Sequence, residues 1–175
     1  SHIDHVKHLI KLSKTHDLKD VFIHAFTDGR DVDPKSGINM INELVESMDG
    51  TNAKLASVCG RYYAMDRDKR WERTKKAYDL IVNGIGKKSN EIEKSIIDSY
   101  NNQITDEFIE PIVVVDNKNL PLAKIEDNDV VIFFNFRTDR GRQLTEALSQ
   151  KDFNDFSMKK LNLKLLTMTN YNDDY

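Results

Sequence analysis

The sequence predicts an α/β fold with three layers (α/β/α), in which helices cover both faces of a mostly parallel or mixed central sheet. Short apolar runs alternate with longer amphipathic stretches along the 175 residues. No internal repeat, low-complexity tract or Pro/Ser-rich linker divides the chain, and 39% hydrophobic residues with only seven glycines suit one core. We therefore expect a single globular domain.

Helix and strand are predicted to alternate in the first half of the chain. Apolar residues at helical spacing indicate a helix over residues 3–12, and Pro34 suits the first turn of a helix that runs to Met48. The predicted strands of this half are Val21–Phe26, closed by Thr27-Asp28-Gly29, and Lys54–Cys59, which ends at Gly60.

The second half is predicted to continue the same alternation. The spacing of Trp71, Ala77, Tyr78 and Leu80 indicates a long helix from Asp66 to Val82. The remaining predicted elements are a helix over 91–100, a strand over 112–115, a strand over 130–136, a helix over 139–148 and a strand around 163–168. Because the strand over 130–136 is the most continuously apolar, we expect it to be central in the sheet.

The charge balance argues against several classes of partner. A net charge of −3, from 26 Lys and Arg against 29 Asp and Glu, gives no summed positive field for nucleic acid or an anionic membrane. The lone Cys59 cannot form an internal disulfide, and the apolar run Val130–Phe134 is far too short to cross a bilayer. We expect a cytoplasmic protein, and a chain that opens with Ser1-His2 is expected to be a piece of a longer one.

The arginines supply the main functional signal. Only eight of the 26 basic residues are arginine, and they occur at positions 30, 61, 67, 70, 73, 137, 140 and 142. Each group begins shortly after a predicted strand, and ligands of open α/β sheets bind at the carboxyl ends of the strands. The planar guanidinium group matches carboxylate and phosphate oxygens in two-pronged pairs. Arginines from three strand ends are therefore predicted to converge on one small anion.

Pairing with neighbouring carboxylates is the competing interpretation, because aspartates are interleaved with these arginines. We apply it to Arg70, Arg73 and Arg142, which lie in or beside predicted helices. The anion site is assigned to the remaining five arginines, Arg30, Arg61, Arg67, Arg137 and Arg140. Asp31 could accept a proton from a substrate hydroxyl, or it could orient Arg30 by an ion pair.

Other candidate sites are weaker. Cys59 is not followed by the arginine that a cysteine phosphatase places six positions later, because Met65 stands there, so we interpret Cys59 as a small buried hydrophobe. A series of His2, His5 and His8 could in principle ligate a metal, but it is typical of a solvated helix face. His24 is predicted to be a hydrogen-bonded core residue.

Three segments resemble one enzyme family. They are Asp28-Gly29-Arg30-Asp31-Val32, the stretch from Gly60 to Trp71, and Asn135-Phe136-Arg137-Thr138-Asp139-Arg140. Together they are similar to the cofactor-independent (2,3-bisphosphoglycerate-independent) phosphoglycerate mutases, over essentially the whole chain. The resemblance covers only the inserted substrate-binding domain, or phosphotransferase domain, so residues 1–175 are expected to be that domain of a larger two-domain isomerase.

The resemblance implies a division of labour. The other domain, which resembles alkaline phosphatase and is absent from this chain, would supply a serine nucleophile and two divalent metal ions, expected to be Mn²⁺. This domain would hold 2- or 3-phosphoglycerate through Arg30, Asp31, Arg61, Arg67, Arg137 and Arg140, without a 2,3-bisphosphoglycerate cofactor. The resemblance further implies a monomeric cytoplasmic enzyme of glycolysis and gluconeogenesis, and an isolated fragment without activity.

Two departures from the family and two alternatives stand beside this expectation. A substrate-contacting histidine that precedes Ser1 in the family and a lysine that follows the C-terminus are absent, and His2 does not inherit that role. A stand-alone module that binds small anions would also explain the arginines. A single-stranded nucleic-acid binder would use Tyr62, Tyr63 and Trp71 as stacking platforms, against the acidic net charge.

Overall fold

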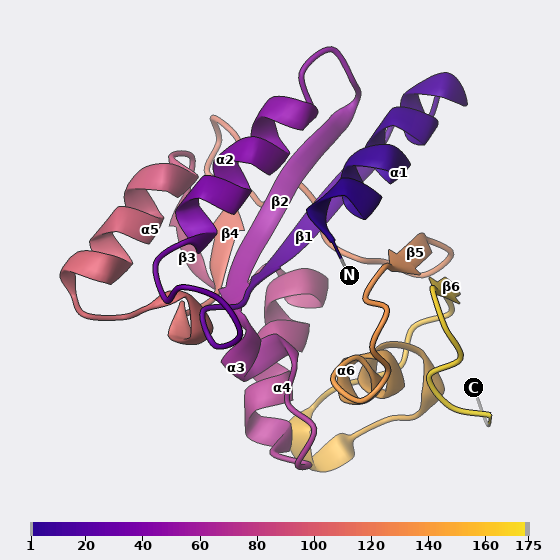
Figure 1. Cartoon of the computed structure of the whole chain (residues 1–175). Coiled ribbons are helices and arrows are strands. Elements are labelled where there is room, and N and C mark those ends of the chain that lie inside the picture. Colours follow the sequence, from indigo (N-terminus) through magenta and orange to yellow (C-terminus); the bar gives the residue numbers. More distant parts are fainter. Residues whose placement is uncertain (1, 174–175) are drawn as a thin grey trace.

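The computed structural model describes residues 2–173 and shows a mixed α/β arrangement with a four-stranded central sheet (Figure 1). The strand order is β1-β2-β4-β3, formed by Val21–Thr27, Ala53–Gly60, Ile112–Val114 and Lys87–Ser89. β2 runs parallel to β1 and antiparallel to β4, while β3 is parallel to β4. The predicted mixed sheet is therefore confirmed. Residues 1, 174 and 175 of the expected domain lie outside the described part.

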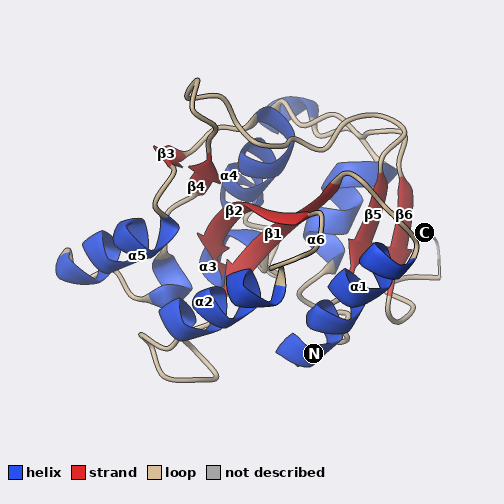
Figure 2. Ribbon diagram, turned by 90° about the horizontal axis from the view of Figure 1, so that it is seen from above, coloured by secondary structure: helices blue, strands red, loops and turns tan. Residues whose placement is uncertain are grey.

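Helices cover both faces of this sheet, as predicted (Figure 2). On one face lie α1 (Ile3–Thr15), α2 (Gly37–Ser47) and α5 (Ile92–Asn101), whose buried residues pack on the apolar side chains of β2 and β4. On the other face lie α3 (Arg61–Ala64), α4 (Trp71–Tyr78) with its π-helical continuation Asp79–Asn83, and α6 (Arg142–Thr145) with its π-helical continuation Glu146–Gln150. Short 3-10 turns at Asp106–Phe108 and Asn154–Phe156 complete the helical elements of the described part.

The predicted central strand at 130–136 is wrong in its place and length. Only β5 (Val130–Phe133) forms there, and it pairs in parallel with β6 (Lys164–Thr167) in a separate two-stranded sheet. Val130 and Ile132 are 63% and 49% exposed, whereas Val58 and Cys59 of β2 are fully buried. An apolar run is common to covered and uncovered strands, so the run alone did not identify β2 as the central strand.

The predicted helix over 66–82 begins later than its apolar spacing suggests. The Asp66 carboxylate accepts the backbone N–H groups of Asp68 and Arg70, at 3.0 Å each, and this holds the chain in a turn. Aspartate side chains often compete with a helix in this way, so α4 starts only at Trp71. The helix predicted from residue 139 likewise starts at Arg142, and α2 starts at Gly37 instead of Pro34. β3 and α3 were not predicted.

His24 of β1 is hydrogen-bonded, as the sequence predicts, although it is only partly buried. Its Nδ1 atom lies 2.7 Å from Ser57 Oγ on β2, and burial lowers its pKa from 6.5 to about 4. Between these pH values the unfolded chain takes up a proton that the folded chain does not, so stability falls as the pH falls through this window. From pH 7 to pH 5, this group is expected to remove about 2 kcal/mol from the free energy of unfolding.

Urea unfolding at pH 7 and pH 5 measures this loss directly. The variant His24→Gln is expected to lose less stability than the parent chain over the same interval, because it has no imidazole to titrate. Equal losses in the two proteins would show that His24 does not carry the pH dependence.

Candidate functional site

A polar pocket of about 120 Å³ lies where β1 and β2 end. The two strands are parallel, so the loop after Thr27 and the helix after Gly60 leave the sheet at the same edge. The pocket is lined by Arg30, Arg61, Arg67, Arg70, Arg73 and Arg140, together with Tyr62, Met65, Asp66, Asp68 and Glu107. Six of the eight arginines therefore meet at one place, from three segments that are far apart in the sequence.

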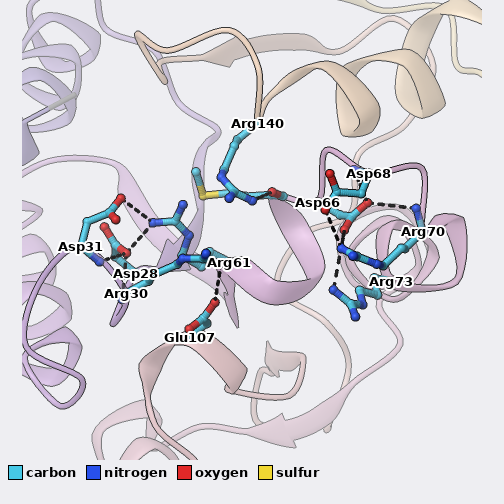
Figure 3. A network of polar contacts seen from close by, with 11 residues as sticks. Asp28, Arg30, Asp31, Arg61, Asp66, Asp68, Arg70, Arg73, Glu107 and Arg140 are labelled. Carbon is cyan, nitrogen blue, oxygen red and sulfur yellow. Dashed lines mark hydrogen bonds and ion pairs between the residues drawn. The ribbon is translucent and has the colours of Figure 1, made fainter.

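Arg61, the first residue of α3, occupies the most buried position among these cations. It is only 6% exposed, and its Nη1 atom donates to Asp28 Oδ1 at 2.6 Å and to Asp31 Oδ2 at 2.9 Å (Figure 3). Charge-assisted bonds of this kind fix the plane of the guanidinium group. Arg61 thus joins the end of β2 to the loop that follows β1.

The loop after β1 folds around Asp28. Besides binding Arg61, Asp28 Oδ1 accepts the backbone N–H groups of Arg30 and Asp31, at 3.1 Å each. Partial burial alone would raise the pKa of Asp28, but these hydrogen bonds and the Arg61 charge outweigh it and lower the pKa. The ionised Asp28 carboxylate therefore fixes the backbone positions of Arg30 and Asp31.

Arg140 comes from the segment after a third strand, β5. Its Nη1 atom donates to the carbonyl oxygen of Met65 at 2.9 Å, which joins the segment after β5 to the segment after α3. Burial lowers the pKa of Arg140, and the positive charges of Arg61, Arg67 and Arg30 lower it further. Four guanidinium groups therefore lie close enough to repel one another, and a bound anion would relieve that repulsion.

The carboxylates around the pocket hold the remaining arginines in place. Arg67 Nη1 lies 2.7 Å from Asp139 Oδ2, and Arg30 Nη1 lies 3.6 Å from Glu107 Oε1. Arg30 and Arg67 are nevertheless more than half exposed, with side-chain exposures of 58% and 51%. Both guanidinium groups thus keep a solvent-facing side for a ligand.

Arg70 and Arg73 behave as the sequence predicts, although they also line the pocket. Arg70 Nη1 pairs with Asp66 at 3.2 Å and with Asp68 at 2.7 Å (Figure 3). Arg73 lies 3.7 Å from Asp66, and its guanidinium carbon is 3.8 Å from the centre of the Tyr62 ring. The prediction for Arg142 needs a correction, because its Nε atom donates to the carbonyl oxygen of Tyr171 and it forms no ion pair with a carboxylate among residues 2–173.

Two further candidate residues lie differently from expectation. Asp31 was expected to pair with Arg30 if its role were to orient a cation, but its carboxylate binds Arg61, and Arg30 pairs with Glu107. Arg137 is exposed and does not line the pocket, so its contact with an anion stays a prediction. Glu107 was missed because only the antiparallel pairing of β2 with β4 brings residues 106–111 to this edge.

The alternative sites of the sequence analysis find little support in the structure. Cys59 is fully buried and burial raises its pKa to about 12, which suits an unreactive core thiol. Within residues 2–173, no group of three His, Cys, Asp or Glu side chains is placed to hold a metal ion. Two of the rings named as stacking platforms for nucleic acid already contact other side chains. The Trp71 ring packs on Phe153, with ring centres 4.1 Å apart, and the Arg73 guanidinium stacks on the Tyr62 ring. No helix in the described part is both long and apolar enough to span a bilayer.

Comparison with known proteins places the chain in a family. Residues 1–173 match the family model described as the BPG-independent PGAM N-terminus. A 2,3-bisphosphoglycerate-independent phosphoglycerate mutase of Flavobacterium psychrophilum is 62% identical over the whole chain, and one of Clostridioides difficile is 47% identical over 98% of it. The chain spans only about a third of the length of these relatives, 35% and 34%.

A solved structure gives the same result. A phosphoglycerate mutase of Leishmania mexicana, crystallised at low cobalt concentration, superposes with a TM-score of 0.87 and 28% identity. The match covers 98% of this chain and 33% of that protein. The family model, the relatives and the fold agree, and the chain belongs to the N-terminal family of the BPG-independent phosphoglycerate mutases.

Proposed function

We propose that this chain is the substrate-binding, or phosphotransferase, domain of a larger phosphoglycerate mutase, and that it binds 2- and 3-phosphoglycerate. The convergence of Arg30, Arg61, Arg67 and Arg140 on one pocket supports this most strongly. A phosphoglycerate carries a carboxylate and a phosphate, and guanidinium groups match both in two-pronged pairs. The mutual repulsion of the four cations favours a ligand with more than one negative charge.

The chain's own residues would bind and orient the glycerate. Arg30, Arg61, Arg67 and Arg140 would take its charged groups, with Arg137 as a further contact. The Asp31 side chain is 59% exposed and one of its oxygens already binds Arg61. It would therefore be placed to accept a proton from a substrate hydroxyl.

The phosphoryl transfer itself would need the part of the parent protein outside this chain. A serine there would take the phosphoryl group as a phosphoserine and return it to the other hydroxyl of the bound glycerate. Phosphoryl transfer depends mainly on positioning and charge stabilisation, which is the contribution we assign to this domain. Two divalent ions, expected to be Mn²⁺, would belong to that other domain, because the described residues here do not fit a metal site.

The wider setting of the proposal follows the family. The parent enzyme would be a monomeric cytoplasmic isomerase of glycolysis and gluconeogenesis that works without 2,3-bisphosphoglycerate. Its two domains would close on each other around the substrate, because water must be kept from the phosphoenzyme.

Calorimetry with 3-phosphoglycerate, sulfate and citrate tests this function. The purified chain is expected to bind 3-phosphoglycerate more tightly than the other two anions and to show no mutase activity of its own. Equal affinity for all three would indicate a general anion-binding module. Interconversion of the two phosphoglycerates at a rate near that of an intact mutase would contradict the assignment of the chemistry to the other domain.

A further inference from the structure

Asp106 is a fully buried carboxylate outside the residues assigned above. Its Oδ2 atom accepts the backbone N–H of Gly37 at 2.7 Å, and its Oδ1 atom accepts the hydroxyl of Tyr100. No Lys, Arg or His in residues 2–173 forms an ion pair with it, and burial raises its pKa. Burying a carboxylate that is held only by neutral donors costs free energy, which its hydrogen bonds must offset.

The backbone of Asp106 is tied to the loop that carries Arg30 and Asp31. Its N–H donates to the carbonyl oxygen of Pro34 at 2.9 Å, and its carbonyl oxygen accepts the Thr27 hydroxyl at 2.7 Å. Together with the Gly37 bond, these contacts fasten the loop at its start, near its end and at the helix that follows. Residues 30–35 between them are exposed, and their other bonds run within the loop, to Asp28 and Asp33, or to Arg61 and Glu107 at the pocket.

The loop approaches Asp106 too closely for side chains at two positions. Gly29 has φ +66°, and a Cβ atom there would lie 2.7 Å from the Asp106 Cβ atom. A Cβ atom on Gly37 would lie 2.6 Å from Asp106 Oδ1. Glycine permits both the left-handed conformation of residue 29 and these approaches. The loop is thus seated directly on the Asp106 side chain.

The residue after Asp106 reaches the pocket itself. Glu107 lines the pocket and pairs with Arg30, while the N–H of Gly60 donates to the carbonyl oxygen of Ile109 at 2.8 Å. The 106–109 segment therefore contacts both the Arg30 loop and the end of β2, from which Arg61 starts. A displacement of this segment would move cations on two sides of the pocket.

We propose that Asp106 is a positioning residue, whose buried carboxylate and backbone hold the loop over residues 28–36 so that Arg30 and Asp31 keep their places beside Arg61. The inference rests on the proposed function for the identity of the ligand. Small errors in the placement of binding groups cost large factors in affinity or rate, so the role can be measured.

Asp106→Ala and a matched control, Ile96→Ala, form the first test. Ile96 is fully buried in α5 and belongs to the same core face, so its truncation lowers stability without removing a bond to the loop. At a temperature where circular dichroism shows both variants folded, Asp106→Ala is expected to weaken 3-phosphoglycerate binding about tenfold. The control is expected to stay within about twofold of the parent chain. Equal affinities for the two variants would overturn the role of Asp106.

Asp106→Asn and Tyr100→Phe separate positioning from simple loss of stability. The amide side chain that Asp106→Asn introduces can still accept the Gly37 N–H and can donate to the Tyr100 oxygen, so binding is expected to recover most of the loss. Tyr100→Phe removes one of the two donors to the Asp106 side chain and is expected to weaken binding less than Asp106→Ala. If Asp106→Ala fails to fold, Tyr100→Phe still tests the proposal. An Asp106→Asn variant as weak as Asp106→Ala would contradict the proposed bonds.

Amide hydrogen exchange decides the question without the substrate. Asp106→Ala is expected to speed exchange selectively in residues 30–37, while Ile96→Ala should not single out this loop. Unchanged exchange in the loop would overturn the positioning role. Failure of the unmodified chain to bind 3-phosphoglycerate would contradict the proposed function instead, while the exchange result would still report on Asp106.

Discussion

Replacing Arg61 with alanine is expected to lower the kcat/KM of a full-length mutase carrying this domain by at least about a hundredfold. Arg61 is 6% exposed and is the only cation that bonds to both Asp28 and Asp31 among the described residues. Its removal takes one positive charge from the pocket and leaves two carboxylates facing the incoming anion. The change therefore leaves both carboxylates without their shared cation as well as deleting a donor.

Two comparison variants make this result specific. Lys87→Ala removes the same charge from β3, where Lys87 pairs with Asp98 at 3.6 Å and does not line the pocket, and it is expected to leave kcat/KM almost unchanged. Arg61→Lys keeps the charge but cannot reproduce the fork of donors, so it is expected to remain impaired. If Arg61→Ala and Lys87→Ala reduced kcat/KM equally, Arg61 would have no special place in the site.

Gly60→Ala is expected to lower the free energy of unfolding by about 3 kcal/mol and to weaken anion binding with it. A Cβ atom on Gly60 would lie 2.2 Å from the carbonyl oxygen of Glu107 and 2.8 Å from that of Asp106. These are backbone atoms, so no side-chain rotation relieves the contact. The 106–109 segment or the end of β2 must move, and Arg30 and Arg61 move with them.

Gly50→Ala is the matched glycine control for this prediction. Gly50 has a positive φ, of +69°, but the nearest atom to an added Cβ is Lys14 Nζ at 3.8 Å. This variant should lose about 1 kcal/mol from its left-handed backbone and keep its anion affinity. Denaturant unfolding and calorimetry on both variants measure the difference. A Gly60→Ala chain as stable as the parent would contradict the close packing at the sheet edge.

The sequence predicted the arginine cluster because parallel strands bring their carboxyl ends to one edge. That rule applies to β1 and β2, which deliver Arg30 and Arg61 to the pocket. Arg140 also reaches the pocket, although it follows β5 of the second sheet. Phe133 at the end of β5 packs on Phe26 of β1, with ring centres 6.2 Å apart, and this contact brings the end of β5 close to the end of β1. The rule could not tell that Arg137, three residues before Arg140, would lie outside the pocket lining.

The carboxylate partners could not be predicted in the same way. Asp28 and Asp31 are neighbours of Arg30 in the sequence, yet both bind Arg61, which is about thirty residues away. Asp106 and Glu107 reach the site only because β4 runs antiparallel to β2. Strand direction is a long-range property of the fold, and no local spacing in the segment before β4 carries it. The apolar periodicity located most helices and strands. It did not give the residue at which a helix starts, because local side-chain bonds such as those of Asp66 set that position.

A crystal structure of this chain with 3-phosphoglycerate is the most direct test of the central claim. The account predicts that the carboxylate and phosphate of the ligand lie among the guanidinium groups of Arg30, Arg61, Arg67 and Arg140. A ligand bound at another face of the molecule, or arginines that turn away from one another around an empty pocket, would contradict it.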